Sequence, residues 1–448
     1  MLQNAHSLAG IVLELMDYKS AIEYLESSIK HGINPGLERI SELAAKLGNP
    51  HLSYPAVHIT GTNGKTSTAR MVSAILSSAG LKTGLYTSPH LERVNERIVV
   101  GDEQIGDKEF AGLLFRIRPE IEGVNGAHDE KLTYFEILTA LAFLYFRERV
   151  VDCAVVEVGM GGRWDATNLV TSRVAVITNV ELEHSEYLGD TVEAIAREKV
   201  GIIKPGALVI TGEKKSEILQ IIEAAGKSAG AELKLLGRDF DYSSEGGTFT
   251  IKGLCAGYDN LFLGLRGEHQ LTNASLAVAA AEAFLGEALL EEGLHKVLKA
   301  VKSPGRLEVV RGTPLVILDG AHNPHGAEIL AKAIKALSYD KLILVLAILR
   351  DKDVDGILRP LCPLASFVVA TENSNSRSLR VDDISQQISK YTQNFQAAGD
   401  VASAVELSLE RAGRRDLVLI TGSLYTVGEA RTFLRKCAQG SRFEAQGQ

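Results

Sequence analysis

Short apolar runs alternate along the chain with longer segments in which apolar residues recur at helical spacing. Several of the short runs are apolar throughout, which is typical of parallel strands that are covered on both faces. The segments between them have the length and period of amphipathic helices. The predicted strands are 56–60, 153–158, 174–178, 208–211, 315–318, 342–347 and 417–421, and the predicted helices include 67–79, 133–149, 192–203 and 328–337. This repeat of strand and helix predicts a doubly wound α/β fold with a parallel sheet.

Two places interrupt the repeat. Residues 239–265 contain two short β-prone runs around Gly246-Gly247, which predicts a small antiparallel insert. At Pro304-Gly305 a helical segment ends and a new α/β series begins. We therefore predict a larger domain over residues 1–302 and a smaller, Rossmann-like α/β domain over residues 303–448.

The composition excludes several classes of partner. Charged residues make up 23% and hydrophobic residues 45% of the chain, and the formal net charge is −8. No long run of one charge occurs, so binding to nucleic acid or to a membrane surface is not expected. The N-terminus lacks the pattern of a signal peptide, no apolar stretch is long enough to span a bilayer, and the four cysteines are widely spaced. These features predict a reduced, cytoplasmic protein.

A glycine-rich segment, His58-Ile-Thr-Gly-Thr-Asn-Gly-Lys-Thr66, follows a predicted strand and opens a predicted helix. A phosphate loop needs this setting, because backbone N–H groups and the helix N-terminus must point at the anion. The glycines permit the backbone geometry, the lysine offers a point charge, and the last threonine offers a hydroxyl to phosphate or magnesium. Ile59 replaces the first glycine of the standard pattern, so a plain strand–helix turn with a solvated lysine is the alternative. The predicted nucleotide-binding residues here are Gly61, Thr62, Asn63, Gly64, Lys65 and Thr66.

The shortened loop resembles that of the Mur ligase superfamily of ATP-dependent, amide-forming enzymes. Five further motifs resemble one branch of it, folylpolyglutamate synthase/dihydrofolate synthase, and follow the order of that family. They are Thr87-Ser-Pro-His-Leu91, Glu157-Val-Gly-Met-Gly-Gly-Arg-Trp-Asp-Ala-Thr-Asn168, Gly267-Glu-His-Gln270 with Asn273, Leu318-Asp-Gly-Ala-His-Asn-Pro324 and Thr421-Gly-Ser-Leu-Tyr425. The resemblance implies a ligase that adds L-glutamate to dihydropteroate or to reduced folates. It also implies an acyl-phosphate intermediate and release of ADP and phosphate.

Candidate metal ligands lie where predicted strands end. Glu157 ends a buried strand, where a carboxylate is costly unless it is paired or holds a metal. Ser88 and His184 also follow β-prone runs, at the strand ends where α/β folds bind ligands. The resemblance assigns the metal positions to Ser88, Glu157 and His184, and implies ATP with two Mg²⁺ ions. It also allows a monovalent cation. Glu183 stands where the family usually has aspartate.

Lys199 lies on a predicted helix at a position that is often carbamylated in the family. A lysine with a depressed pKa can capture carbon dioxide and become an anion that supports a magnesium cluster. The alternative is a plain surface lysine on an amphipathic helix. The resemblance therefore implies catalytic roles for Lys65, His184 and Lys199.

Further ATP contacts are implied at Asn273, Arg306, Asp319 and His322. Asn273 is close to the start of an alanine-rich helical pattern, where the alternative is a helix cap. Arg306 follows the predicted domain boundary and can reach phosphate, whereas Asp319 ends a strand and suits a ribose hydroxyl.

For the acceptor, the resemblance points to Thr133-Tyr-Phe-Glu136 and Trp164-Asp-Ala166. Phe135 can stack on a flat pterin ring, while Asp165 accepts from its amino and ring N–H groups. The alternative for Phe135 is a place in the helix core. The predicted substrate-binding residues are Thr133, Tyr134, Phe135, Glu136, Trp164, Asp165 and Ala166.

Two other functions remain open at this point. One is a different Mur-type ligase that acts on a cell-wall precursor. The other is a non-catalytic, ATP-binding switch protein, which would have no need for Glu157, His184 and Lys199 together. The expected partners are small molecules, with no nucleic acid and no membrane, and the expected state is a monomer.

Overall fold

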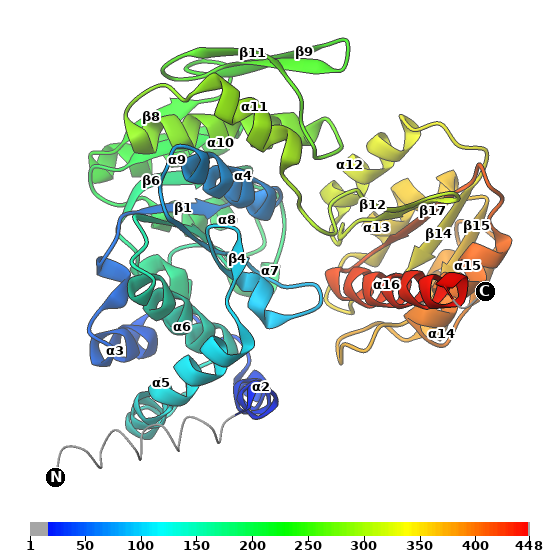
Figure 1. Cartoon of the computed structure of the whole chain (residues 1–448), viewed down its shortest axis with the longest axis horizontal. Coiled ribbons are helices and arrows are strands. Elements are labelled where there is room, and N and C mark those ends of the chain that lie inside the picture. The colour runs from blue at the N-terminus through cyan, green and yellow to red at the C-terminus, as the bar shows by residue number, and fades with distance from the viewer. Residues whose placement is uncertain (1–16, 447–448) are drawn as a thin grey trace. The chain divides into compact units, whose positions relative to one another are not determined.

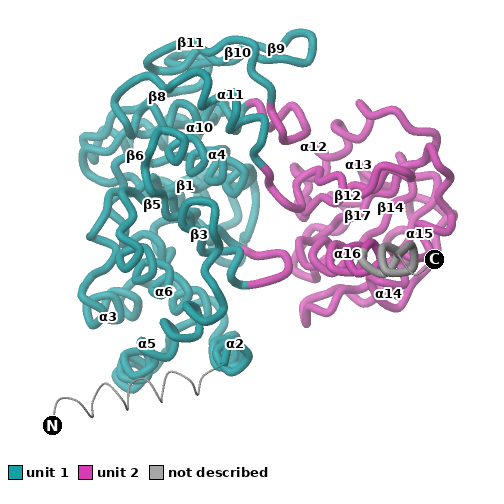
Figure 2. The backbone as a smooth tube through the Cα atoms, in the orientation of Figure 1, with its two compact units in different colours: residues 1–88, 94–262, 272–301 teal, residues 89–93, 263–271, 302–448 magenta. Residues whose placement is uncertain are grey.

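The computed structural model describes residues 17–446. The chain splits into two compact units, which Figure 2 colours separately. The first unit holds residues 1–88, 94–262 and 272–301, and the second holds residues 89–93, 263–271 and 302–448. Each unit is built around its own large sheet.

The first unit contains an eight-stranded sheet in the order β4-β3-β2-β5-β1-β6-β7-β8. Its strands are β1 (Ala56–Thr60), β2 (Thr83–Tyr86), β3 (Ile98–Val100), β4 (Glu103–Gln104), β5 (Cys153–Glu157), β6 (Ser172–Ile177), β7 (Leu208–Thr211) and β8 (Glu232–Leu235). From β2 to β8 the neighbours are parallel, and β3 and β4 add an antiparallel edge. Every residue of β1 and β5 is buried, including the polar His58, Thr60 and Glu157, and the other residues of these two strands are apolar.

Helices cover this sheet. They are α2 (Tyr18–Glu26), α3 (Glu38–Lys46), α4 (Lys65–Ser78), α5 (Asp107–Ala127), α6 (Tyr134–Glu148), α7 (Ser185–Leu188), α8 (Val192–Lys199), α9 (Ser216–Ala229), α10 (His269–Leu285) and α11 (Glu291–Ala300). Helices α2 and α3 pack on α5 and α6, and all four share one apolar core with the sheet (Figure 1). The N-terminal helices are therefore part of the first unit's core.

The predicted insert is a three-stranded antiparallel sheet of β9 (Asp241–Glu245), β10 (Thr248–Lys252) and β11 (Gly257–Leu261). Gly246 and Gly247 form the first turn with φ values of +60° and +88°, which favour glycine. Buried Glu282 of α10 accepts hydrogen bonds from the Tyr258 hydroxyl and from Leu254 N, at 2.6 and 2.5 Å. These contacts attach the insert to α10.

The second unit contains a six-stranded sheet in the order β12-β13-β17-β14-β15-β16. Its strands are β12 (Glu308–Gly312), β13 (Leu315–Leu318), β14 (Leu342–Leu346), β15 (Phe367–Ala370), β16 (Phe395–Ala397) and β17 (Leu417–Thr421). Its helices are α12 (Pro324–Lys335), α13 (Val354–Leu361), α14 (Val381–Ile388), α15 (Val401–Arg411) and α16 (Leu424–Gln446). Alternate residues of the central strands enter two separate apolar clusters, one with α12 to α14 and one with α15 and α16. This doubly wound arrangement confirms the Rossmann-like prediction.

The predicted limits of three helices are wrong by a few residues. The helix expected over 192–203 ends at Lys199, and a 3-10 turn over Val200–Ile202 follows it. The helix expected from residue 328 already begins at Pro324, because the side chain of Asn323 caps it and proline suits the first turn. The helix expected from residue 67 begins at Lys65, directly after Gly64.

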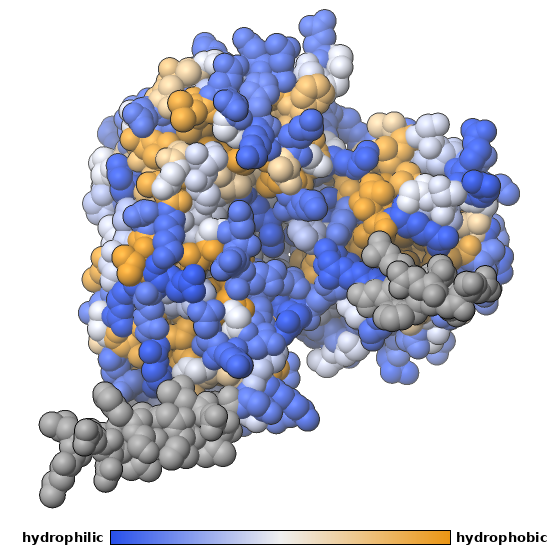
Figure 3. All heavy atoms as spheres, viewed as in Figure 1, coloured by the Kyte–Doolittle hydropathy of each residue, from blue (hydrophilic) through white to orange (hydrophobic). Residues whose placement is uncertain are grey.

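Polar residues cover most of the face seen in Figure 3, and apolar residues are scattered over it in small groups. Among the described residues, no helix has the length and apolarity needed to cross a membrane.

Candidate active site

The phosphate loop connects β1 to α4, as predicted. Gly61 and Gly64 have φ values of +147° and +86°. A Cβ atom on Gly61 would lie 1.8 Å from Thr178 Oγ1, and one on Gly64 would lie 2.5 Å from Asn273 Oδ1. Backbone conformation and close approach therefore both require glycine at these two positions.

The loop is attached to the segment that follows β6. Thr62 Oγ1 donates to Glu181 O at 3.1 Å and accepts from Glu181 N at 3.0 Å. Asn179 accepts from the backbone of the loop twice, from Thr62 N through its carbonyl and from Asn63 N through its side chain, both at 2.9 Å. The same segment continues to His184, the predicted metal ligand. These bonds therefore fix the backbone that leads to His184 relative to the phosphate loop.

The Lys65 side chain folds back over the loop. Its Nζ donates to Gly61 O at 2.6 Å and to Thr62 O at 3.0 Å. These two carbonyls hold the ammonium group inside the loop, beside the N-terminus of α4, where an anion is favoured. The half-buried Lys65 side chain is therefore bound to the loop, and its contact with phosphate stays a prediction.

Three of the predicted phosphate and metal residues meet at Glu157. This carboxylate is 1% exposed at the end of β5. Its Oε1 accepts from Thr66 Oγ1 at 2.7 Å, and its Oε2 accepts from Ser88 N at 3.1 Å. A carboxylate next to two hydroxyl-bearing residues offers the oxygen ligands that a hard divalent cation prefers, so these residues fit magnesium.

His184 is the residue before α7, with a left-handed φ of +48°. It precedes Ser185 at the start of α7 and follows Glu183, the partner of Lys199. Within residues 17–446, no group of three or more histidine, cysteine, aspartate or glutamate side chains is arranged to hold a metal ion. The set of Ser88, Glu157 and His184 therefore stays a prediction.

Lys199 is buried and paired. Its side chain is 1% exposed, and its Nζ lies 2.6 Å from Glu183 Oε1, whose side chain is 8% exposed. Burial lowers the pKa of Lys199, although the Glu183 carboxylate opposes this effect. Burial raises the pKa of Glu183, but the ammonium groups of Lys199 and Lys65 outweigh it and bring that pKa to about 2. The alternative of a surface lysine is wrong, because the last turn of α8 faces inward here.

Two of the predicted acceptor residues lie close to Gly159. A Cβ atom on this glycine would lie 2.6 Å from Phe135 Cζ and 3.1 Å from Asp165 Oδ2. The Phe135 ring is half-buried, with its centroid 6.0 Å from that of Tyr86, and Arg97 lies 5.6 Å above the ring of Tyr134. Phe135 therefore packs against the core and also borders the loop that carries Asp165.

Asp165 is a fully hydrogen-bonded, buried carboxylate. It accepts from Thr167 N at 3.0 Å, from Thr167 Oγ1 at 2.5 Å and from Met160 N at 2.9 Å. Burial raises its pKa, and these donors oppose the rise. Thr167 gives its proton to Asp165, so its oxygen accepts from His58 Nε2, which lies 2.8 Å away. Burial lowers the pKa of His58 to about 3, which keeps this ring neutral.

The other predicted acceptor residues have distinct surroundings. The Trp164 side chain is 49% exposed, whereas Ala166 is buried. Thr133 and Glu136 cap the start of α6 with each other's side chains. Thr133 and Glu136 therefore affect an acceptor site chiefly by fixing the position of α6.

The predicted ATP contacts are divided between the two units. Asn273 lies in the first unit beside Gly64; α10 already begins at His269, so the alternative of a helix cap is wrong. In the second unit, Asp319 accepts from Leu307 N at 2.8 Å and from Ala321 N at 2.9 Å, and burial raises its pKa against the opposing charge of Arg306. His322 Nδ1 lies 2.7 Å from Gly320 O in the same loop. Asp319 and His322 lie in this loop, and Arg306 is close enough for its charge to act on Asp319.

Comparison with known proteins identifies the family. Residues 59–281 match the Mur ligase middle domain, and residues 305–424 match the Mur ligase glutamate ligase domain. The chain is 38% identical over 445 residues to a dihydrofolate synthase/folylpolyglutamate synthase of Mycobacterium tuberculosis, with 91% of each protein covered. The chain belongs to the dihydrofolate synthase/folylpolyglutamate synthase family of Mur ligases.

Two solved structures of the family are similar over nearly their whole length. Escherichia coli FolC in complex with DHPP and ADP is 32% identical with a TM-score of 0.86, and the match covers 96% of this chain and 99% of that one. A bifunctional folylpolyglutamate synthase/dihydrofolate synthase with Mn, AMPPNP and L-glutamate bound is 30% identical with a TM-score of 0.83. That match covers 94% of this chain and 98% of the other. These matches confirm the family and the fold predicted from the motifs.

Several residues of this family member's site were missed by the sequence analysis. Gly159 leaves room for both Phe135 and Asp165, His58 contacts the Thr167 hydroxyl, and Asn179 accepts from the backbone of the phosphate loop. His58 and Gly159 lie inside motifs that had been recognised, so their place in those motifs was a usable signal. Asn179 follows a predicted strand but has no local pattern that sets it apart.

Proposed function

We propose that this chain is an ATP-dependent ligase that adds L-glutamate to dihydropteroate and to reduced folates, forming ADP and phosphate. The observation that carries the proposal is the meeting of Thr66, Glu157 and the Ser88 backbone beside a phosphate loop that holds Lys65. Family membership supplies the class of substrate. The test is whether continuous turnover of ATP to ADP requires both a folate-type acceptor and L-glutamate.

The proposed reaction has two steps. The acceptor carboxylate attacks the γ-phosphorus of ATP, so that an acyl phosphate forms and ADP leaves. The free amine of glutamate then attacks the acyl carbon, phosphate leaves, and an amide bond forms. Lys65 places positive charge where phosphoryl oxygens develop negative charge, and no covalent protein nucleophile is needed.

Ser88, Glu157 and His184 are the residues proposed to hold divalent metal, with Thr66 close to Glu157. Bound magnesium would neutralise charge on the phosphates. The chain's own part is to present the Glu157 carboxylate at a buried strand end. Hydrogen bonds from Thr66 and Ser88 orient both of its oxygens there.

We further propose that Lys199 is carbamylated in the active enzyme. The neutral amine would add to carbon dioxide and lose a proton, which replaces a cation by an anion. Burial supports the proposal because it favours the neutral amine, and this requires the ion pair with Glu183 to open. A crystal map with ATP and magnesium bound tests it, and a bare ammonium at Lys199 would contradict it.

The remaining ATP contacts are proposed at Gly61, Thr62, Asn63, Gly64, Asn273, Arg306, Asp319 and His322. A monovalent cation is a further proposed cofactor. We also propose that the enzyme is a cytoplasmic monomer whose partners are its small-molecule substrates.

We propose that Phe135 stacks on the pterin ring of the acceptor and that Asp165 accepts hydrogen bonds from the N–H groups of this ring. We expect Asp165→Asn to lower kcat/KM for dihydropteroate by about 1–3 kcal/mol more than for a glutamylated folate, the cost of one buried polar contact. Asparagine keeps one oxygen for the Thr167 donors but loses the second acceptor. The measurement is kcat/KM for both substrates in the wild type and the variant. An equal loss for the two substrates would show that Asp165 only supports its loop.

A further inference from the structure

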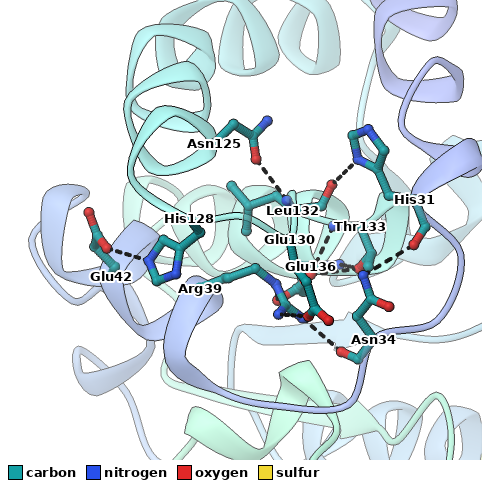
Figure 4. A network of polar contacts seen from close by, with 10 residues as sticks. All are labelled: His31, Asn34, Arg39, Glu42, Asn125, His128, Glu130, Leu132, Thr133 and Glu136. Atoms are coloured by element: carbon teal, nitrogen blue, oxygen red, sulfur yellow. Dashed lines mark hydrogen bonds and ion pairs between the residues drawn. The ribbon is translucent and has the colours of Figure 1, made fainter.

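An arginine outside the recognised motifs reaches the start of α6. Arg39 is the second residue of α3 and is 5% exposed. Its guanidinium donates to Glu130 Oε2 at 2.8 Å and to Asn34 O at 2.7 Å, and its Nε lies 3.3 Å from Glu136 Oε1 (Figure 4). One side chain thus connects α3 with both ends of the segment Glu130–Glu136.

Glu136, which faces Arg39, also caps the start of α6. Its Oε2 accepts from Thr133 N and from Thr133 Oγ1, both at 2.8 Å, while Glu136 N donates to Thr133 Oγ1 at 3.2 Å. The other carboxylate oxygen faces Arg39, and neither that oxygen nor Arg39 Nε has a hydrogen-bond partner among the described residues. Tyr134 and Phe135 lie between the two capping residues, so their backbone is held at both ends.

The Arg39–Glu136 contact joins two opposite charges that are both buried. The Glu136 side chain is 5% exposed and that of Arg39 is 6% exposed, whereas Glu130 is 62% exposed. Burial raises the pKa of Glu136, and the Thr133 donors and Arg39 oppose the rise. A buried carboxylate without its cation must neutralise or move toward water. Loss of Arg39 is therefore expected to displace the capping carboxylate itself.

Neighbouring contacts hold the same segment from other sides. His31 Nδ1 lies 2.9 Å from Leu132 O, and Asn125 Oδ1 accepts from Leu132 N at 2.7 Å. His128 Nε2 lies 2.8 Å from Glu42 Oε2. Figure 4 shows these side chains gathered around the stretch that leads into α6. These contacts hold the segment that leads into α6, the helix that carries Phe135.

We propose that Arg39 is a positioning residue for the acceptor: through Glu136 it fixes the start of α6 and so holds Phe135 in place beside Gly159 and Asp165. The proposal rests on the proposed function, in which Phe135 contacts the pterin ring. Arg39 itself does not touch the substrate.

Arg147 provides a matched control. It lies in the last turn of α6, and its Nη1 donates to Leu47 O at 2.8 Å and to Gly48 O at 3.2 Å, at the end of α3. Arg39 and Arg147 therefore connect the same two helices at opposite ends. If Arg39 only joins α3 to α6, replacing either arginine should have the same kind of effect.

The test compares Arg39→Met, Arg39→Lys and Arg147→Met with the wild type. For each protein, KM and kcat are measured for dihydropteroate or tetrahydrofolate, whichever the wild type turns over, and KM is measured for ATP. We expect Arg39→Met to raise the acceptor KM by about tenfold or more and to leave the ATP KM within about twofold, because a misplaced contact group weakens binding of that substrate alone. Arg39→Lys keeps the positive charge, so its acceptor KM should lie between those of the wild type and Arg39→Met. Arg147→Met should lower Tm without changing the acceptor KM.

A second readout measures acceptor binding without turnover. Trp164 is the only tryptophan of the chain, so its fluorescence can follow titration with the same acceptor. Arg39→Met should weaken this binding by the same factor as it raises KM. If Arg39→Met fails to fold, Arg39→Lys carries the comparison. Equal acceptor KM values in the Arg39 and Arg147 variants, or equal changes for acceptor and ATP, would overturn the proposal. A wild type that turns over neither acceptor would instead contradict the proposed function.

Discussion

Replacing Lys65 with alanine is expected to lower kcat by about 10²–10³-fold, or ~3–4 kcal/mol, the usual loss when one transition-state charge contact is removed. The Nζ of Lys65 lies within the phosphate loop, 2.6 Å from Gly61 O and 3.0 Å from Thr62 O. The two carbonyls keep the charge where phosphoryl oxygens would bind. The measurement is the steady-state rate of ADP formation with saturating ATP, acceptor and glutamate.

An exposed lysine of the same unit, Lys214, distinguishes this effect from a change in overall charge. Lys214 is exposed, and its backbone N–H donates to Glu213 Oε1. Lys214→Ala should therefore retain the wild-type rate. Near-normal turnover by folded Lys65→Ala would remove the proposed role of the loop lysine.

In the protein without a carbamate on Lys199, Glu183→Gln is expected to lower the free energy of unfolding by about 3–5 kcal/mol, because it leaves the buried ammonium of Lys199 without its counter-charge. The two side chains are 8% and 1% exposed and lie 2.6 Å apart. Replacing both, as Glu183→Gln with Lys199→Met, should recover much of the loss, since no uncompensated charge then remains. Denaturant unfolding of the three proteins measures these differences.

Arg116 and Glu148 form a pair of nearly the same length, 2.5 Å, with side chains that are 52% and 39% exposed. Glu148→Gln should change the free energy of unfolding by less than about 1 kcal/mol, as is usual for exposed pairs. Comparable losses in Glu183→Gln and Glu148→Gln would contradict the importance of burial at Lys199.

The sequence predicted most of the fold because its signals are local. Strands such as β13 and β14 consist entirely of apolar residues, and the strand–loop–helix order around Lys65 places the glycine-rich loop at the end of β1. The predicted residues that end strands, Glu157 and Asp319, are both buried at those ends in the structure.

What the sequence could not predict depends on contacts between distant segments. The helical pattern around Lys199 suggested exposure, because the period of α8 does not reveal that Glu183 lies against it. Arg39 and Glu136 are far apart in the chain, and the sequence around each of them gives no sign that they form an ion pair. The start of α10 was misjudged because its first turn has few apolar residues, although it is helical from His269.

The most direct measurement of the central claim is ADP release by the purified chain with ATP and magnesium. Dihydropteroate, tetrahydrofolate or a muramyl cell-wall precursor is offered as acceptor, each with and without L-glutamate. We expect continuous ADP turnover only when a folate-type acceptor and glutamate are both present, with one glutamate joined for each ADP released. Turnover with the muramyl precursor alone, or ATP binding without coupled ADP release under any of these conditions, would contradict it.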